Sequence, residues 1–218
     1  MVWKTVKQAR LKGRRNAYED EVLVRLHEVL PPGVHVTVLA DRGFGDQKLY
    51  TFLTELGFGF IIRFRGVVAV ESQDGEVRTA GTWVPLNGRI RQLCGAKVTK
   101  DRYGLDSVVC VKARGMKEPW CLAVGGATIT GATAVKLYAR RFTIEETFRD
   151  TKDQRYGLGL SATHVRDVNR RDRLLLSCAM AMTLLTLLGA AGESLGMDRM
   201  LKANTVKKRT HLALPPRL

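Results

Sequence analysis

Residues 34–66, VHVTVLADRGFGDQKLYTFLTELGFGFIIRFRG, place a helix pattern between two strand patterns. The stretch begins with alternating, β-branched side chains, which predict a strand that ends at Asp41. After a glycine turn, Asp46 can cap a helix over 47–56, and residues 58–66 again predict a strand. This order predicts an α/β fold in which both strands belong to one sheet and are joined by a right-handed crossover.

The sequence on either side of this stretch has a different character. Residues 17–30 carry apolar side chains at helical spacing and are followed by Pro-Pro-Gly, which predicts a helix with a sharp end. Residues 67–129 hold short β-type runs between Gly, Asp-Gly and Asn-Gly turns. They predict an antiparallel, β-rich insertion within the α/β domain. From Ala132 onward the sequence is mainly helical.

The charge of the chain favours an acidic partner. Lys and Arg number 36 against 21 Asp and Glu, a net charge of +15. Nucleic acid is the first expectation and an anionic membrane surface the second. Residues 1–15 and 200–217 are both strongly basic, which fits arms that neutralise phosphates or, alternatively, charge that keeps the two ends soluble.

Two further features bear on the compartment. The four cysteines are scattered without a CxxC pair, which argues against a disulfide framework or zinc site and fits a reducing cytoplasm. Residues 174–191, LLLSCAMAMTLLTLLGAA, are uncharged over a length near that of a membrane span. Because they include Ser177 and two threonines, we expect a buried helix packed on a sheet, in a soluble chain without a membrane partner.

The stretch YARRFTIEETFRDTK, residues 138–152, concentrates polar chemistry on one face of a helix predicted over 134–152. At about 100° per residue, five side chains fall within a stripe roughly 80° wide. These are Tyr138, Arg141, Glu145, Arg149 and Lys152. A carboxylate between cations can hold a divalent metal while the cations hold phosphates. The alternative is an exposed helix with an ordinary pair of Glu145 and Arg149.

Asp41 adds a second carboxylate to this hypothesis. Active-site groups gather at the carboxyl ends of strands in α/β sheets, although an aspartate in that place can also simply form a turn or cap. Asp41 and Glu145, with strong positive charge around them, predict a metal-dependent phosphodiesterase site.

The same residues resemble a known family. Tyr138-(2)-Arg141-(3)-Glu145-(6)-Lys152 is similar to the Y-(2)-R-(3)-E-(6)-K signature of DDE transposases of the insertion-sequence-four family. The segment ADRGFGD, 40–46, resembles the family's segment around its second catalytic aspartate. The β-rich stretch resembles the insertion that these enzymes carry between that aspartate and the glutamate. RFTIEETFRDTK and LKANTVKKRTH also resemble family segments, so the resemblance covers nearly the whole chain.

The resemblance implies an RNase H-like catalytic domain and a two-metal mechanism with Mg²⁺ or Mn²⁺. It implies that Asp41 and Glu145 are the catalytic metal ligands, and that Tyr138, Arg141 and Lys152, with Arg149 beside them, contact phosphates of the transposon ends. Trp120 lies near the place of an aromatic residue that stacks on a flipped base. The alternative is that this tryptophan is a core residue of its strand.

The resemblance also implies a domain layout and partners. We expect a partial RNase H-like core over 1–66, the β-rich insertion over 67–129, and a helical part of the catalytic core over 130–218. The expected partners are DNA at transposon ends and a second copy of the chain in a synaptic complex. The expected location is the cytoplasm, at the nucleoid.

The family uses three acids, and this sequence supplies two matches. The acids before Asp41 fall within the predicted helix 17–30 and do not follow a strand. They are Glu19, Asp20, Glu21 and Glu28. We therefore expect that the chain lacks the first part of the catalytic domain and, isolated, does not transpose. The alternative to an enzyme is a DNA-binding remnant without catalysis. A basic RNA-binding protein would explain the charge but not the stripe.

Overall fold

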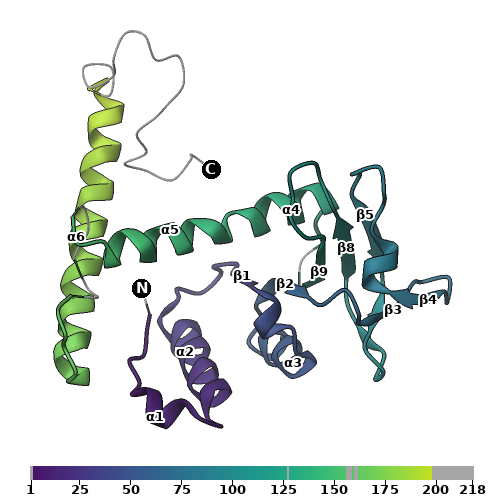
Figure 1. The fold of residues 1–218 in the computed structure, drawn as a ribbon, viewed down its shortest axis with the longest axis horizontal. Coiled ribbons are helices and arrows are strands. Elements are labelled where there is room, and N and C mark those ends of the chain that lie inside the picture. Colours follow the sequence, from purple (N-terminus) through teal and green to yellow (C-terminus); the bar gives the residue numbers. More distant parts are fainter. Residues whose placement is uncertain (1, 127, 156–158, 160–161, 198–218) are drawn as a thin grey trace. The chain divides into compact units, whose positions relative to one another are not determined.

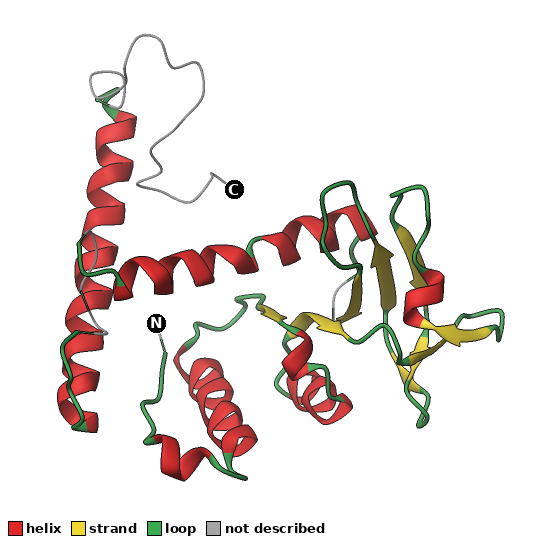
Figure 2. Ribbon diagram, viewed as in Figure 1, coloured by secondary structure: helices red, strands yellow, loops and turns green. Residues whose placement is uncertain are grey.

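The computed structural model describes residues 2–126, 128–155, 159 and 162–197 (Figure 1). The chain forms two compact units, one of residues 27–142 and one of residues 1–26 with 143–218. Among the described residues, every strand belongs to the first unit (Figure 2). The mixed α/β class predicted from the sequence is confirmed.

The first unit is built on a sheet with the strand order β1-β2-β9-β8-β5. Strand β1 pairs with β2 in parallel, and the other neighbours are antiparallel. The strands are β1 (Thr37–Ala40), β2 (Gly59–Phe64), β5 (Arg91–Cys94), β8 (Ser107–Val111) and β9 (Trp120–Gly125). In register, Val38 lies opposite Phe60, and Ile62 lies opposite Ala123. Strands β2, β8 and β9 are almost entirely buried and form the centre of the core.

The predicted strand–helix–strand order is confirmed in detail. Helix α3 (Gln47–Glu55) connects β1 to β2 and packs on β2. Asp46 caps it, because its side chain accepts a hydrogen bond of 3.1 Å from the backbone N–H of Lys48. Gly57 follows with a φ of 70°, a left-handed conformation that suits glycine after a helix end. Asp41 comes directly after β1 and precedes a short 3₁₀ turn, η1 (Arg42–Phe44).

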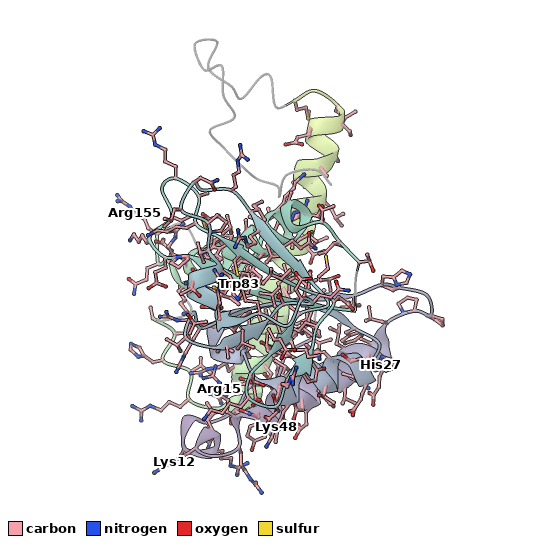
Figure 3. All side chains as sticks on the ribbon, turned by 90° about the vertical axis from the view of Figure 1, so that its right-hand side faces the viewer. Lys12, Arg15, His27, Lys48, Trp83 and Arg155 are labelled. Atoms are coloured by element: carbon pink, nitrogen blue, oxygen red, sulfur yellow. The ribbon has the colours of Figure 1, made fainter. Side chains whose placement is uncertain are left out.

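The β-rich stretch contributes to two sheets. Strands β5, β8 and β9 continue the sheet of β1 and β2, whereas a second sheet has the order β4-β3-β6-β7. Its strands are β3 (Ala69–Glu71), β4 (Val77–Thr79), β6 (Lys97–Val98) and β7 (Tyr103–Gly104), with the 3₁₀ turn η2 (Ala80–Trp83). Trp83, labelled in Figure 3, is buried and donates a hydrogen bond to Val70 O. The division at residues 66 and 129 stays a prediction. The shared sheet has strands on both sides of residue 66, and its last strand, β9, ends at Gly125, before residue 129.

The helix predicted over 134–152 is two helices, so one unbroken helix is wrong. Helix α4 (Gly131–Ala139) packs on the first sheet, and α5 (Arg141–Lys152) begins after Arg140. The N–H of Arg140 bonds to Leu137 O at 3.0 Å, a bond three residues back that tightens the end of α4. Tyr138 therefore belongs to α4, while Arg141 opens α5.

The second unit contains the remaining helices, α1 (Gln8–Leu11), most of α2 (Arg15–Val29) and α6 (Val168–Ser194). Within its own unit α6 is largely exposed, and its packing on a sheet stays a prediction, because every described strand belongs to the first unit. Cys178 is the one buried residue described in α6, and Leu184, Leu185 and Leu188 are more than 60% exposed. At about 100° per residue, these three leucines fall within an arc of about 100°, so they form one exposed apolar stripe along the helix. By length and composition α6 could cross a membrane, which alone is weak evidence for a span.

Candidate functional site

Three residues predicted from the sequence meet at the end of β1. The Tyr138 hydroxyl donates a hydrogen bond of 3.2 Å to Asp41 Oδ1. Arg141 Nη2 lies 4.0 Å from Asp41 Oδ2. Strand β1 positions the carboxylate, and the adjoining ends of α4 and α5 bring the phenol and the guanidinium to its two oxygens. The structure thus joins the predicted strand-end acid to the first half of the predicted stripe.

This environment keeps Asp41 ionised. Partial burial by itself would raise the pKa of Asp41. The backbone N–H of Arg42, the charge of Arg141, the Tyr138 hydroxyl and the charge of Arg63 outweigh burial, and the pKa lies below its ordinary value. The side chain is 40% exposed, so its oxygens are also accessible to a ligand from solvent.

Tyr138 supports Asp41 from inside the core. Its side chain is fully buried beside Ile61, Val109 and Leu122. Its ring meets that of Trp120 edge to face, with centroids 4.9 Å apart. A phosphate contact by Tyr138 stays a prediction, because the hydroxyl donates to Asp41 in this structure.

The buried hydroxyl of Tyr138 predicts a specific pH dependence of stability. Burial first, and then the charge of Asp41, raises the pKa of Tyr138 from 10.0 to about 12. Between these values the unfolded chain has released the proton that the folded chain keeps. Stability present below about pH 10 is therefore lost as the pH rises toward 12. Urea unfolding at about pH 9 and about pH 11 should show a larger loss for the wild type than for Tyr138→Phe. Equal losses would contradict this assignment.

Trp120 makes the contacts of a core residue. It lies at the start of β9, half buried, and its ring stacks against Phe142 with centroids 6.0 Å apart and planes 29° from parallel. Arg141 stands over the Phe142 ring, 4.9 Å from its centroid. The ring thus helps to fix Tyr138 and the start of α5. Base stacking by Trp120 stays a prediction.

Sequence reasoning missed three charged residues near Asp41. Arg63 Nη2 donates to Glu118 Oε2 at 2.7 Å, and Arg42 Nη1 donates to the same oxygen at 3.3 Å. Arg63 belongs to β2, where it is the single charged residue in the apolar run GFIIRF. A single charge in an otherwise apolar strand could have identified Arg63 as a candidate functional residue from the sequence. No local pattern marks Glu118, because its partners lie 55 and 76 residues away.

The second half of the predicted stripe belongs to the other unit. Glu145, Arg149 and Lys152 line one open pocket on α5, so they do share a face. Asp153 lines the same pocket and was not predicted. Glu145 and Asp41 belong to different units, and their pairing at one metal site stays a prediction.

The donor set suits a hard cation in chemical type. Mg²⁺ and Mn²⁺ prefer carboxylate oxygens, and both Asp41 and Glu145 are accessible acids. Within the described ranges, no group of three or more His, Cys, Asp or Glu side chains is arranged to hold a metal ion. The two predicted ligands therefore fit such an ion, while a complete metal centre is not seen in those ranges.

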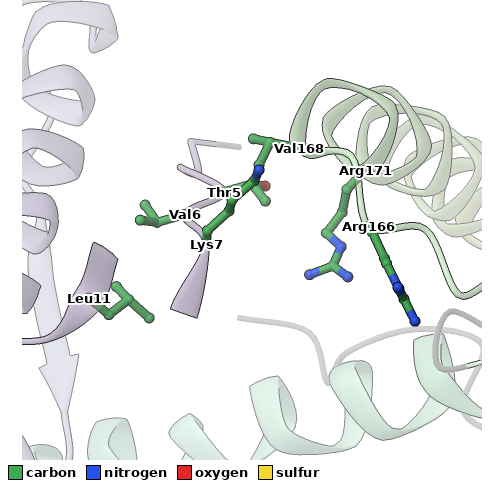
Figure 4. Close-up of a pocket in the computed structure, with 7 residues that line it drawn as sticks. All are labelled: Thr5, Val6, Lys7, Leu11, Arg166, Val168 and Arg171. Atoms are coloured by element: carbon green, nitrogen blue, oxygen red, sulfur yellow. The ribbon is translucent and has the colours of Figure 1, made fainter. Parts of the chain in front are cut away.

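A basic pocket lies in the second unit (Figure 4). It has a volume of about 530 Å³ and is formed by the N-terminal segment and the start of α6. Lys7, Arg166 and Arg171 supply three cations, and no acid is among the residues that line it. The same unit carries further positive charge on exposed side chains such as Lys12 and Arg15 (Figure 3). These side chains suit an anionic ligand.

Two comparisons with known proteins are informative. A family model described as a transposase DDE domain matches residues 6–184. The matched range covers most of the chain and contains both predicted ligands and the whole spaced signature. Among curated proteins, none matches the chain.

Proposed function

This chain belongs to the transposase DDE domain family, and we propose that it acts in DNA transposition by metal-dependent cleavage and strand transfer at insertion-sequence ends. Family membership supports DNA as the substrate and cleavage with transfer as the reaction class. Within the family, the spaced signature supports a place among insertion-sequence-four members. It also supports an RNase H-like core, with β1 and β2 as two of its strands. The observation that carries the proposal is the contact of Asp41 with Tyr138 and Arg141.

Asp41 and Glu145 would hold Mg²⁺ or Mn²⁺, which when bound activates water or a DNA 3′-hydroxyl and stabilises charge on the phosphate. The chain's own residues prepare the first ligand. Tyr138 fixes one oxygen of Asp41, and Arg141 keeps positive charge near the other. Because the pKa of Asp41 lies below its ordinary value, its carboxylate is deprotonated at neutral pH. A proton therefore does not compete with the metal ion for Asp41.

The cations of the stripe would hold the DNA. We propose that Arg141, Arg149 and Lys152 contact phosphates at the transposon end, with Tyr138 acting mainly through Asp41. We propose that Trp120 stacks on a displaced base only after Phe142 moves from its ring, since the two rings stack in this structure. Lys7, Arg166 and Arg171 would add phosphate contacts from the second unit.

Two further expectations follow the family. Family members are in general soluble and cytoplasmic, and a location at the nucleoid is our proposal for this chain. Cleavage and transfer act on paired transposon ends, so we propose that two copies work together.

One observation favours a second candidate, DNA binding without cleavage. The four acids that precede Asp41 all lie on α2, and none follows a strand. A site with two acids instead of three would hold metal weakly and misplace the attacking oxygen.

A substitution at Glu145 separates the two candidate functions. A plasmid that carries the ends of the chain's own insertion sequence is incubated with purified protein, and nicking is measured. Mn²⁺ is the better ion, since Mg²⁺ demands near-ideal geometry. The proposal predicts Mn²⁺-dependent nicking that Glu145→Ala reduces to the level without protein, while DNA binding persists. Equal reactions of wild type and variant, both binding DNA, would favour the second candidate.

A further inference from the structure

One carboxylate oxygen collects two guanidinium groups beside the proposed site. Glu118 Oε2 accepts hydrogen bonds from Arg63 and Arg42 at 2.7 and 3.3 Å. Arg63 Nη2 also donates to Pro119 O at 3.3 Å, which holds the guanidinium near the loop that carries Glu118. Two cations that converge on one oxygen form a place for an anion, and Glu118 fills it in this structure.

The two arginines flank Asp41. Arg42 follows it in the chain, and its backbone N–H bonds to the Asp41 carboxylate. Arg63 is close enough for its charge to act on the same carboxylate. Its side chain is only 15% exposed, and its buried Nε has no hydrogen-bond partner within the part of the chain that the structure describes. Arg63 thus has donor capacity that Glu118 does not use fully.

The ion pairs of Glu118 with the two arginines are exposed to solvent. The Glu118 side chain is 57% exposed, and it lies in the loop between β8 and β9. An ion pair this exposed contributes little to stability, so separating it costs little. A phosphate offers several oxygens and suits the guanidinium fork better than one carboxylate oxygen does.

We propose that Glu118 occupies the position of a DNA phosphate in the free chain, and that DNA binding replaces its carboxylate at Arg63 and Arg42 with a phosphate of the backbone. The inference rests on the proposed function, since it assumes that DNA approaches Asp41. Glu118 then lowers affinity for DNA and restrains the two arginines until DNA arrives.

The test is the affinity for a short DNA duplex of mixed sequence, measured by fluorescence anisotropy without metal. Glu118→Gln keeps the size of the side chain and removes its charge. It should raise affinity about threefold to tenfold, because the phosphate no longer competes with an ion pair. Glu76→Gln is the matched control: Glu76 also pairs with an arginine, Arg78, in the second sheet, and the change in net charge is identical.

A second variant shows that the gain comes from this site. In an Arg42→Gln background, Glu118→Gln should raise affinity clearly less than in the wild-type background, since one of the two competing donors is gone. Arg42 is 56% exposed, so its replacement should not disturb folding, and circular dichroism checks each variant.

The outcomes separate this inference from the proposed function. Equal affinities of Glu118→Gln and Glu76→Gln, with DNA bound by both, would overturn the exchange and leave the proposed function standing. A gain that persists undiminished without Arg42 would likewise overturn it. Failure of the wild type and every variant to bind DNA would overturn both.

Discussion

Replacing Arg141 and Lys152 together with glutamine should lower the affinity for duplex DNA by about 10- to 100-fold near 0.1 M salt. Each residue is proposed to neutralise one phosphate, and each lost contact should reduce the slope of log K against log salt by about 0.9. Affinity measured by anisotropy over a series of salt concentrations gives both quantities.

The control for this prediction removes the same charge elsewhere. Arg78 and Arg102 pair with Glu76 and Glu71 in the second sheet, away from the stripe in sequence. Their joint replacement by glutamine should change affinity and salt slope much less. Because Arg141 also contacts Asp41, the double variant changes the surroundings of Asp41 as well as the DNA contacts. The single variant Lys152→Gln avoids this effect, and it should produce about half of the double variant's change in salt slope. Equal losses in the two double variants would show that DNA responds only to net charge.

Glu145→Gln should lower the affinity for Mn²⁺ by about 100-fold or more, because it removes an ionised oxygen ligand while keeping the side chain's shape. Electron paramagnetic resonance of free Mn²⁺ measures this binding without any need for activity. The expected loss is larger than that from changing a residue that merely supports a ligand.

The neighbouring acid provides a close control. Glu146 is exposed on the same helix, and the predicted stripe excludes it. Glu146→Gln should therefore keep the wild-type affinity for Mn²⁺ and match Glu145→Gln in its affinity for DNA. A similar loss of Mn²⁺ binding in both variants would mean that α5 attracts the ion only by its general charge.

Local patterns were sufficient to predict the part of the fold that holds Asp41. The alternation before Asp41, the cap at Asp46 and the glycine at 57 are properties of short segments, and each is seen in the structure. The spacing of Tyr138 and Arg141 predicted a shared face, and both meet the Asp41 carboxylate.

Features that depend on distant pairing were not predictable in this way. The sequence of β9 does not indicate that it pairs with β2 rather than with strands of the second sheet. Glu118 has its role through Arg63, which is 55 residues away. The apolar composition of α6 suggested burial, but composition does not say whether a partner surface is present.

We propose that Asp41 and Glu145 hold the same divalent ion. The measurement is the Mn²⁺ affinity of the wild type, Asp41→Asn, Glu145→Gln and the double variant. Each single change should weaken Mn²⁺ binding strongly, and the double variant should bind little worse than either, because the one shared ion has already been lost. Independent, additive losses, or a wild-type affinity in Asp41→Asn, would contradict it.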